Sequence, residues 1–445
     1  MPRIVIEGAY VATLDPARRE FAGHVVAEGN RLVAVGPGPA PAYDDARVVD
    51  GRGCLVTPGF VNTHQHLYQW VTRGLAADAT LFEWLTTLYP VWARITEETV
   101  YVAARAALAQ LALTGCTTVA DHHYVFPGGD LLAAEIAAAA EIGLRFHPAR
   151  GSMDRGQKDG GLPPDSVVED RDTILAATED AIDRWHDPSP GSMLQIVVAP
   201  CSPFSVSGEL MRESAELARR RGVRLHTHLA ETTDETSWCR ETYGCTPLEY
   251  ADRLGWTGPD VWFAHGIHFD DAEIKHLGGT GTGVAHCPSS NARLGAGIAR
   301  AADLRAAGSP VGLGVDGAAS NESGSLVEEL RHALLFARAR GGPQALTVRA
   351  ALEMATLDGA RILGRSDDIG SLEPGKQADL AVWDLAGLPH AGIPDPLAAL
   401  ALSTPPPLAL LLANGRPVVE HAVLQTADVP TLAAEVARTQ AALCR

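Results

Sequence analysis

The middle of the chain alternates short apolar runs with longer stretches rich in Ala, Leu, Glu and Arg. Apolar runs of strand length that alternate with helical stretches are typical of repeated βα units, which build a parallel sheet. Eight such units predict an α/β protein built on a TIM-like (β/α)8 barrel. The predicted barrel strands are 55–62, 116–121, 143–149, 194–199, 222–228, 260–265, 282–286 and 310–315.

The two ends of the chain have a different pattern. Residues 1–56 alternate short β-rich runs with turn residues, and the same texture returns in 370–383 and 408–415. Two β-rich ends around a different middle predict a small β-sandwich domain formed from both chain ends. We therefore expect a β domain made of residues 1–56 plus 369–445, and a catalytic barrel made of residues 57–368.

The net charge of the chain limits the classes of molecule that it is expected to bind. The 445-residue chain carries a formal net charge of −18. Nucleic-acid polymers and anionic lipid surfaces are bound by a surplus of Lys and Arg, so the negative net charge argues against both as partners. The apolar stretch 397–412 is interrupted by Pro405, Pro406 and Pro407, which argues against a membrane span. The expected partner is a small molecule.

The cysteines and the first residues of the chain suggest a location. Seven cysteines are scattered without a CxxC pair, which favours free thiols in a reducing compartment. The first residues lack the charged leader and apolar core of a signal peptide. These patterns predict a cytoplasmic protein.

The strongest chemical signal is a pair of histidines at the end of the first predicted barrel strand. His64 and His66 are one residue apart, and alternating side chains on a strand project to the same side. Such a pair can bind one metal ion, although an isolated HxH is weak evidence.

Further polar residues follow other predicted strands. In a barrel of this kind, the active site lies at the C-terminal ends of the strands, so residues distant in sequence converge there. The residues expected to meet His64 and His66 at that face are His228, Glu231, His265 and Asp316.

The chemistry of this set suits one divalent metal. The imidazoles of His64, His66 and His228 with the Asp316 carboxylate favour one Zn²⁺ per chain, with Fe²⁺ as the alternative. Such an ion activates water by lowering its pKa. Glu231 is then expected to transfer protons, while His265 and Asp316 orient the attacking group and accept a proton. The predicted fourth strand has no lysine to bridge a second ion, so a mononuclear site is expected unless Glu231 bridges two ions.

Substrate contacts are less constrained by the sequence. Gln69 follows the histidine pair, Arg150 follows the third strand and Asn291 follows the seventh, so each is a candidate for binding substrate. A surface or loop-capping role is the alternative for all three. Trp84 and Trp92 are candidates for stacking on a flat ring, although aromatic residues at helical spacing are more often part of a core.

Several motifs together resemble the amidohydrolase superfamily. They are PGFVNTHQH (58–66), HTHLAET (226–232), AHGIH (264–268), HCPSSNARLGAG (286–297), GVDGAASN (314–321) and GSLEPGKQADL (370–380). Together they span nearly the whole chain and occur in the superfamily's order. Within it, the sequence is most similar to the deaminases and chlorohydrolases of purines, pyrimidines and s-triazines, and in particular to the 8-oxoguanine deaminases.

This resemblance implies an activity and roles for residues. It implies a zinc-dependent hydrolysis that replaces a ring amino group with oxygen, converting 8-oxoguanine to urate and ammonia. It assigns the ligands to His64, His66, His228 and Asp316, the proton shuttle to Glu231 and the water partner to His265, and it predicts a homo-oligomer. Gln65 and the pair His122 and His123 depart from the usual pattern. Guanine, isocytosine or an s-triazine as substrate, and a catalytically inactive scaffold, remain the alternatives.

Overall fold

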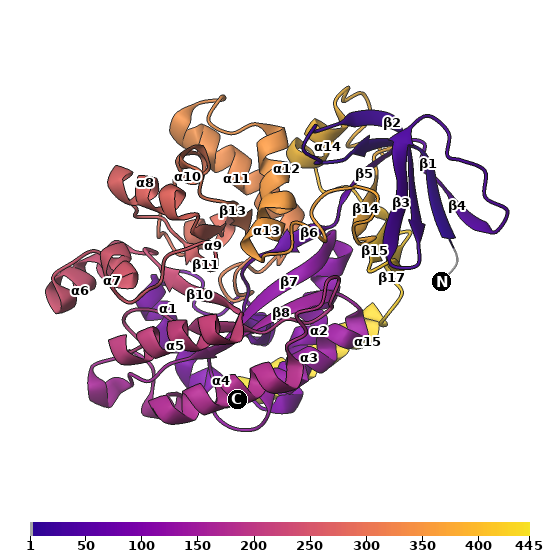
Figure 1. Ribbon diagram of the computed structural model, residues 1–445. Helices are drawn as coiled ribbons and strands as arrows, with labels where there is room; N and C mark the ends of the chain where they lie inside the picture. The colour runs from indigo at the N-terminus through magenta and orange to yellow at the C-terminus, as the bar shows by residue number, and fades with distance from the viewer. Residues whose placement is uncertain (1–2) are drawn as a thin grey trace.

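The computed structural model describes residues 3–445, and its centre is a closed barrel of eight parallel strands (Figure 1). Each of the eight predicted runs supplies one strand, so the predicted barrel is confirmed. The strands are β6 (Phe60–Asn62), β7 (Cys116–His123), β8 (Arg145–Ser152), β9 (Val197–Pro200), β10 (Arg224–Leu229), β11 (Val261–His265), β12 (Gly283–His286) and β13 (Val311–Leu313).

Helices connect these strands and cover the outside of the barrel (Figure 1). Side-chain caps define several helix starts: Ser207, for example, accepts a hydrogen bond from the Leu210 amide at the start of α5. The helices are α1 (Leu81–Trp92), α2 (Glu97–Leu113), α3 (Leu131–Ile142), α4 (Arg171–Trp185), α5 (Gly208–Arg221), α6 (Thr233–Tyr243), α7 (Pro247–Arg253), α8 (Asp271–Thr280), α9 (Pro288–Arg293), α10 (Ala301–Ala307), α11 (Leu326–Gly341), α12 (Val348–Ala355), α13 (Leu357–Ile362) and α14 (Pro396–Leu402), with 3-10 turns η1 (Leu67–Thr72), η2 (Gln157–Asp159) and η3 (Asp165–Val167).

The two chain ends form one mixed sheet beside the barrel, as expected. The antiparallel pairing of β5 with β14 joins the N-terminal strands to the C-terminal ones. Gly59 separates β5 from β6, so the single predicted run 55–62 in fact serves both the sheet and the barrel. The strands of this sheet are β1 (Arg3–Ala12), β2 (Glu20–Glu28), β3 (Arg31–Pro37), β4 (Ala46–Asp50), β5 (Cys54–Pro58), β14 (Leu380–Asp384), β15 (Leu408–Ala413), β16 (Arg416–Glu420) and β17 (Val423–Leu424).

This sheet curls around its own core. At one edge, the Leu32 amide of β3 donates to the carbonyl of Lys376, in the segment that leads into β14. Side chains from both chain ends, such as Ile6, Val25 and Leu410, belong to one buried cluster. Burial of these apolar side chains stabilises the association of the two ends.

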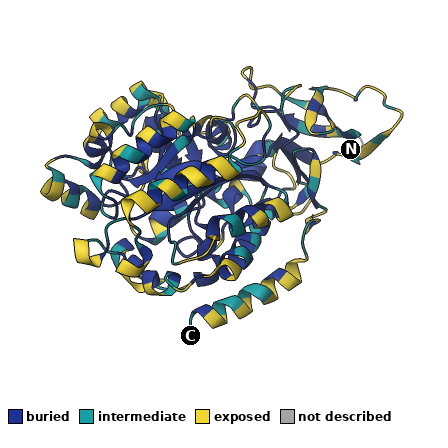
Figure 2. Cartoon of the chain, turned by 60° about the horizontal axis from the view of Figure 1, so that its bottom comes forward, coloured by how far each residue is buried: buried dark blue, intermediate teal, exposed yellow. Residues whose placement is uncertain are grey.

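The last helix, α15 (Val429–Leu443), was not anticipated from the sequence. It packs against α2, where Glu435 lies 2.9 Å from Arg105, and Leu432 is buried. Figure 2 shows α15 at the edge of the molecule with an exposed outer face. The predicted boundaries assign this segment to the β domain, whereas the helix itself lies on the barrel.

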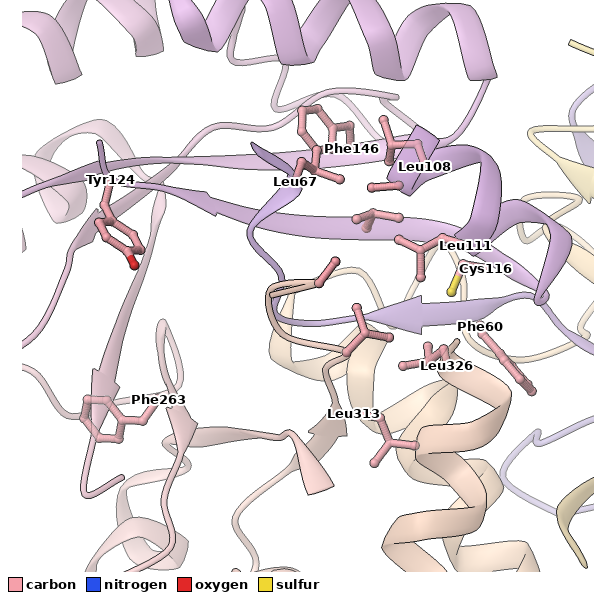
Figure 3. Close-up of a cluster of buried hydrophobic side chains, with 14 of the residues drawn as sticks. Phe60, Leu67, Leu108, Leu111, Cys116, Tyr124, Phe146, Phe263, Leu313 and Leu326 are labelled. Atoms are coloured by element: carbon pink, nitrogen blue, oxygen red, sulfur yellow. The ribbon is translucent and has the colours of Figure 1, made fainter. Parts of the chain in front are cut away.

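A hydrophobic cluster fills the space between the barrel strands and their covering helices. Figure 3 shows Phe60 and Phe146 of the strands near Leu108 and Leu111 of α2. Apolar packing thereby fixes the strand positions, and through them the loops at the strand ends.

Two further findings concern membranes and disulfides. Within residues 3–445, no helix is both long and apolar enough to cross a bilayer. All seven cysteines are free, and all except Cys444 are buried.

Candidate active site

The C-terminal ends of the barrel strands bring the predicted metal-binding residues together. His64 and His66 follow β6, His228 lies in β10, and Asp316 follows β13. All four side chains are buried. His66 Nε2 lies 3.2 Å from His228 Nε2, and Asp316 Oδ1 lies 3.4 Å from Nε2 of both His64 and His66. The four groups therefore face one common point.

Hydrogen bonds to carbonyl oxygens fix the tautomer of two of the imidazole rings. His66 Nδ1 donates to the His122 carbonyl at 2.6 Å, and His228 Nδ1 donates to the Cys201 carbonyl at 2.7 Å. A carbonyl only accepts, so Nδ1 carries the proton in both rings, and Nε2 of each neutral ring is a bare lone pair.

His226 fixes the third ring in the same way. His226 Nδ1 donates to the Trp262 carbonyl at 3.0 Å, which leaves His226 Nε2 as an acceptor. His64 Nδ1 donates to that atom at 2.8 Å. Nε2 of His64 is therefore also bare, and it is buried without a hydrogen-bond partner.

These observations fit a divalent metal. Three bare imidazole nitrogens and one carboxylate oxygen form a donor set typical of zinc. Two facing lone pairs only 3.2 Å apart are unfavourable unless a cation lies beside them. Burial lowers the pKa of His66 to about 3, so a proton does not provide that cation at neutral pH. The residues present therefore fit a metal ion such as Zn²⁺.

The Asp316 carboxylate is oriented by its neighbours. Oδ1 accepts from the Gly317 amide and Oδ2 from the Ser290 hydroxyl, both at 2.6 Å. Burial alone would raise the pKa of Asp316, but the imidazoles around it outweigh burial and hold the pKa well below its usual range. The backbone of Asp316 is in the left-handed region, with φ of 62°. This aspartate is thus held ionised in one direction.

Glu231 and His265 lie beside this cluster. Glu231 Oε2 is 3.6 Å from His265 Nε2, which is 4.0 Å from Asp316 Oδ2. Burial raises the pKa of Glu231 to about 7, so its carboxyl group can gain or lose a proton near neutral pH. Burial alone would lower the pKa of His265, but Glu231 and Asp316 outweigh it and raise that pKa.

A cavity open to solvent, with about 420 Å³ of empty space including its mouth, lies beside these groups. Most of the residues that line the cavity are apolar or aromatic. Four of them, Leu81, Trp84, Leu85 and Tyr89, belong to α1. The remaining lining residues are His66, Tyr124, Cys201, Ser202, Phe204, His228, Glu231, His265, Leu294, Asp316 and Ser320. An apolar slot with a few polar groups at one end is a typical small-molecule site.

The three predicted substrate residues lie outside this lining. Arg150 is buried, with its guanidinium 2.8 Å from Glu169 and stacked on Phe126. Asn291 accepts a hydrogen bond from His265 Nδ1 at 2.9 Å, so it orients the imidazole. Gln69 is fully buried, and neither polar atom of its amide has a partner.

The two tryptophans differ from each other. Trp84 lines the cavity, and its ring nitrogen donates to the Ala319 carbonyl at 3.0 Å. Trp92 is fully buried and packs edge-on against Trp84. Only Trp84 is available to a ligand.

Sequence reasoning missed three residues that orient the site. His226 accepts a hydrogen bond from His64, and Ser290 donates one to Asp316. The Glu235 carboxylate accepts hydrogen bonds from the amides of Ala230 and Glu231, each at 3.0 Å. Two of them had a signal: His226 and His228 repeat the HxH spacing, and Glu235 stands three residues after the helix cap Thr232. No pattern singled out Ser290.

Comparison with known proteins places the chain among hydrolases. The amidohydrolase family model matches residues 55–418. The sequence is 49% identical over 428 residues to 8-oxoguanine deaminase of Pseudomonas aeruginosa, a match that covers 95% of this chain and 94% of that protein. It is 41% identical over 355 residues to hydroxydechloroatrazine ethylaminohydrolase of Pseudomonas sp. strain ADP, covering 78% of this chain and 73% of that protein.

A solved structure gives a similar result. Atrazine chlorohydrolase from Arthrobacter aurescens TC1, complexed with zinc, superposes with a TM-score of 0.94 at 34% sequence identity. The superposition covers 98% of this chain and all of that one.

Proposed function

Because this chain belongs to the amidohydrolase family, we propose that it is a zinc-dependent hydrolytic deaminase of an amino-substituted free nucleobase. The proposed reaction converts 8-oxoguanine to urate and ammonia. The P. aeruginosa 8-oxoguanine deaminase, at 49% identity over 95% of the chain, supports this choice of substrate.

One observation carries the proposal: three imidazoles present bare Nε2 atoms to the Asp316 carboxylate. His64, His66, His228 and Asp316 are the proposed ligands of one Zn²⁺, with Fe²⁺ as the alternative. A metal held there supplies Lewis-acid activation of a water molecule at neutral pH. The hydrogen bonds behind each ring keep the nitrogens aimed at that point.

Proton transfer falls to the adjacent carboxyl and imidazole. Glu231, with a pKa of about 7, gives a proton to a ring nitrogen, which makes the neighbouring ring carbon electrophilic. Water adds to that carbon and gives one of its two protons to Glu231, which passes it to the departing amine. The second proton leaves the added hydroxyl as the carbonyl forms and returns to Glu231 by way of Asp316 and His265. One water enters and one ammonia leaves.

The cavity favours a flat, uncharged ring. Trp84, Tyr89 and Phe204 provide aromatic walls, and none of the described residues that line the cavity is Lys or Arg. Arg150, the cation predicted to bind substrate, is paired with Glu169. Phosphorylated or carboxylated substrates therefore lack a counter-charge, whereas a free base does not need one. Gln69 stays in the proposal as a polar contact because its buried amide is unpaired.

An s-triazine is the second candidate substrate. The 0.94 TM-score with atrazine chlorohydrolase supports it, because a triazine is also a flat ring with electrophilic carbons. Guanine and isocytosine are further alternatives. We also propose a cytoplasmic homo-oligomer, and the seven free cysteines are compatible with a reducing location.

The test is ammonia release by the zinc-loaded enzyme from 8-oxoguanine, guanine, isocytosine and a hydroxylated aminotriazine, measured in parallel. We expect the highest kcat/KM with 8-oxoguanine, together with stoichiometric urate. Preference for the triazine would replace the proposed substrate and keep the reaction class. Absence of ammonia release from all four compounds, with metal bound, would contradict the proposed deaminase.

A further inference from the structure

A second cluster of titratable side chains lies outside the cavity. Asp121 and His123 come from β7 and Glu135 comes from α3, and all three are at most 2% exposed. One oxygen of each carboxylate and one ring nitrogen lie within 4.8 Å of one another. The proposed reaction uses none of these groups.

This cluster lies behind the segment that carries His66. Three hydrogen bonds join the end of β7 to that segment. The His122 amide donates to the Gln65 carbonyl at 2.7 Å, His66 Nδ1 donates to the His122 carbonyl at 2.6 Å, and the Leu67 amide donates to Asp121 Oδ1 at 2.6 Å. The position of His66 therefore depends on the position of residues 121–123.

Helix α3 contacts this cluster through Glu135. Most other residues of α3 are Ala, Leu or Ile, so a fully buried glutamate there is costly without a partner. Its partner is His123, whose Nδ1 lies 2.8 Å from Glu135 Oε1. The other carboxylate oxygens, Asp121 Oδ2 and Glu135 Oε2, are buried without a hydrogen-bond partner.

The second ring nitrogen of His123 decides where the proton is. His123 Nε2 donates to the Val125 carbonyl at 2.8 Å, and a carbonyl only accepts. In the neutral ring, Nδ1 is then a lone pair, so Glu135 must supply the proton between them. Burial raises the pKa of Glu135 to about 8 and lowers that of His123 to about 4, which agrees with this assignment.

We propose that Glu135 is a positioning residue, which holds His123 through a retained proton, lies beside Asp121, and so fixes the end of β7 that orients His66. The inference rests on the proposed metal site, because His66 is one of its ligands. Glu135 itself lies outside the cavity, and its effect passes through the hydrogen bonds of residues 121–123 to residues 65–67.

Three variants of α3 test this role. Glu135→Leu removes the proton and the hydrogen bond to His123. Glu135→Gln keeps a donor for His123 Nδ1 and has a second N–H for Asp121. Leu132→Ala is the control, because Leu132 is also buried on α3, where its side chain has only apolar contacts to lose. If Glu135 positions His66 through polar contacts, Glu135→Leu and Leu132→Ala give different results; if its role is only to pack, they give the same result.

Two measurements on the full-length chain separate these outcomes. The first is amide hydrogen exchange of the metal-free protein over residues 64–70, and the second is Zn²⁺ affinity by competition with a chelator. We expect Glu135→Leu to speed exchange at the Leu67 amide and to weaken Zn²⁺ binding by about 10- to 100-fold. Glu135→Gln should stay close to wild type in both, and Leu132→Ala should lower Tm without either change.

Equal Zn²⁺ affinity and equal exchange in Glu135→Leu and wild type would overturn the proposal. So would a Glu135→Gln variant as impaired as Glu135→Leu. If Glu135→Leu does not fold, Asp121→Ser tests the same link at the Leu67 amide, with the same expected changes. The exchange measurement needs neither metal nor substrate, so its result remains distinct from failure of the proposed deaminase.

Discussion

The two ends of the barrel both contain buried charged groups, but only one end satisfies them internally. At the N-terminal end, Arg145 and Arg365 are paired with carboxylates. At the C-terminal end, the imidazoles of His64, His66 and His228 present bare nitrogens to one carboxylate. The first arrangement is complete within the protein, whereas the second is complete only with a ligand.

The paired end connects the barrel to the terminal sheet. Arg145, the first residue of β8, lies 3.1 Å from Asp379, which directly precedes β14, and it also donates to the Gly191 carbonyl at 2.8 Å. Arg365 lies 3.0 Å from Asp368. A guanidinium with its donors used in this way stabilises the joint between the two regions, but offers nothing to a ligand.

Stability and function are therefore separated along the barrel axis. Changes at the paired, N-terminal end should alter the free energy of unfolding with little effect on the chemistry. Changes at the C-terminal end, called the open end below, should alter the chemistry with little effect on the free energy of unfolding. The following predictions test this separation, beginning with the largest expected effect.

Loss of a ligand should give the largest effect. His228→Ala leaves two imidazoles and one carboxylate at the site, so we expect deaminase activity to fall below detection. The rise in Tm that Zn²⁺ gives the wild type should disappear, since that rise depends on binding to the folded state. Tm of the metal-free variant should stay close to that of the metal-free wild type. Full Zn²⁺ binding by His228→Ala would exclude this ligand set.

Loss of the proton shuttle should come next. Glu231→Gln keeps the shape of the side chain but cannot transfer a proton, so kcat should fall by about 10²- to 10⁴-fold. Zn²⁺ content, measured by elemental analysis, should not change. A fully active Glu231→Gln enzyme would refute the proposed mechanism.

At the paired end, Arg145→Met should act on stability alone. It leaves Asp379 buried without its cation, which should cost about 3–5 kcal/mol in free energy of unfolding. Denaturant titration measures this loss, and kcat/KM per folded molecule should remain that of the wild type. A stable but inactive Arg145→Met variant would show that the two ends are not separate.

Asn291→Leu should have a moderate effect confined to the open end. The residue accepts from His265 Nδ1, so its removal should lower kcat by about tenfold, the equivalent of one lost hydrogen bond. The pH profile of kcat should shift, while KM stays unchanged because Asn291 does not line the cavity. A change in KM alone would restore the direct substrate contact that the sequence suggested.

The last prediction is a difference in pH dependence between the two regions, which changes stability gradually and leaves the active site intact. The pKa of Glu135 is raised from 4.5 to about 8 in the folded state, so its stabilising contribution is complete below 4.5 and is lost as pH rises through 8. Glu135→Gln should remove that loss, at most about 1.4 kcal/mol per pH unit. The pKa of Asp368 is lowered, so its contribution is lost as pH falls below 3.8, and Asp368→Asn should flatten the acid side. Unfolding measured between pH 3 and 9 checks both slopes.

The sequence predicted most of the barrel because its signals are local. Each strand is a short apolar run, and a polar residue at the end of a run must lie at the mouth of the barrel. His64, His66, His228 and Asp316 were found in this way. The helix α15 was missed because it follows β-rich segments and buries few side chains, Leu432 and Leu443 among them.

The side-chain partners could not be predicted from spacing. The sequence suggested that Arg150 and Asn291 contact the substrate. In the structure, Arg150 forms an ion pair with Glu169, and Asn291 accepts a hydrogen bond from His265. Glu135 lies in an Ala-rich helix, where a glutamate usually faces solvent. Whether such groups are free or paired is set by tertiary contacts between elements far apart in the chain.

The backbone conformations of His265 and Asp316 also bear on how the enzyme would change under selection. With φ of 72° and 62°, both residues occupy a region that glycine adopts at much lower cost, a penalty of about 1 kcal/mol or more each. His265→Gly would relieve that strain but would also remove the proposed catalytic imidazole. A lineage that no longer needed the proposed activity would no longer have to carry this strain, whereas one that needs it must offset the strain elsewhere in the fold.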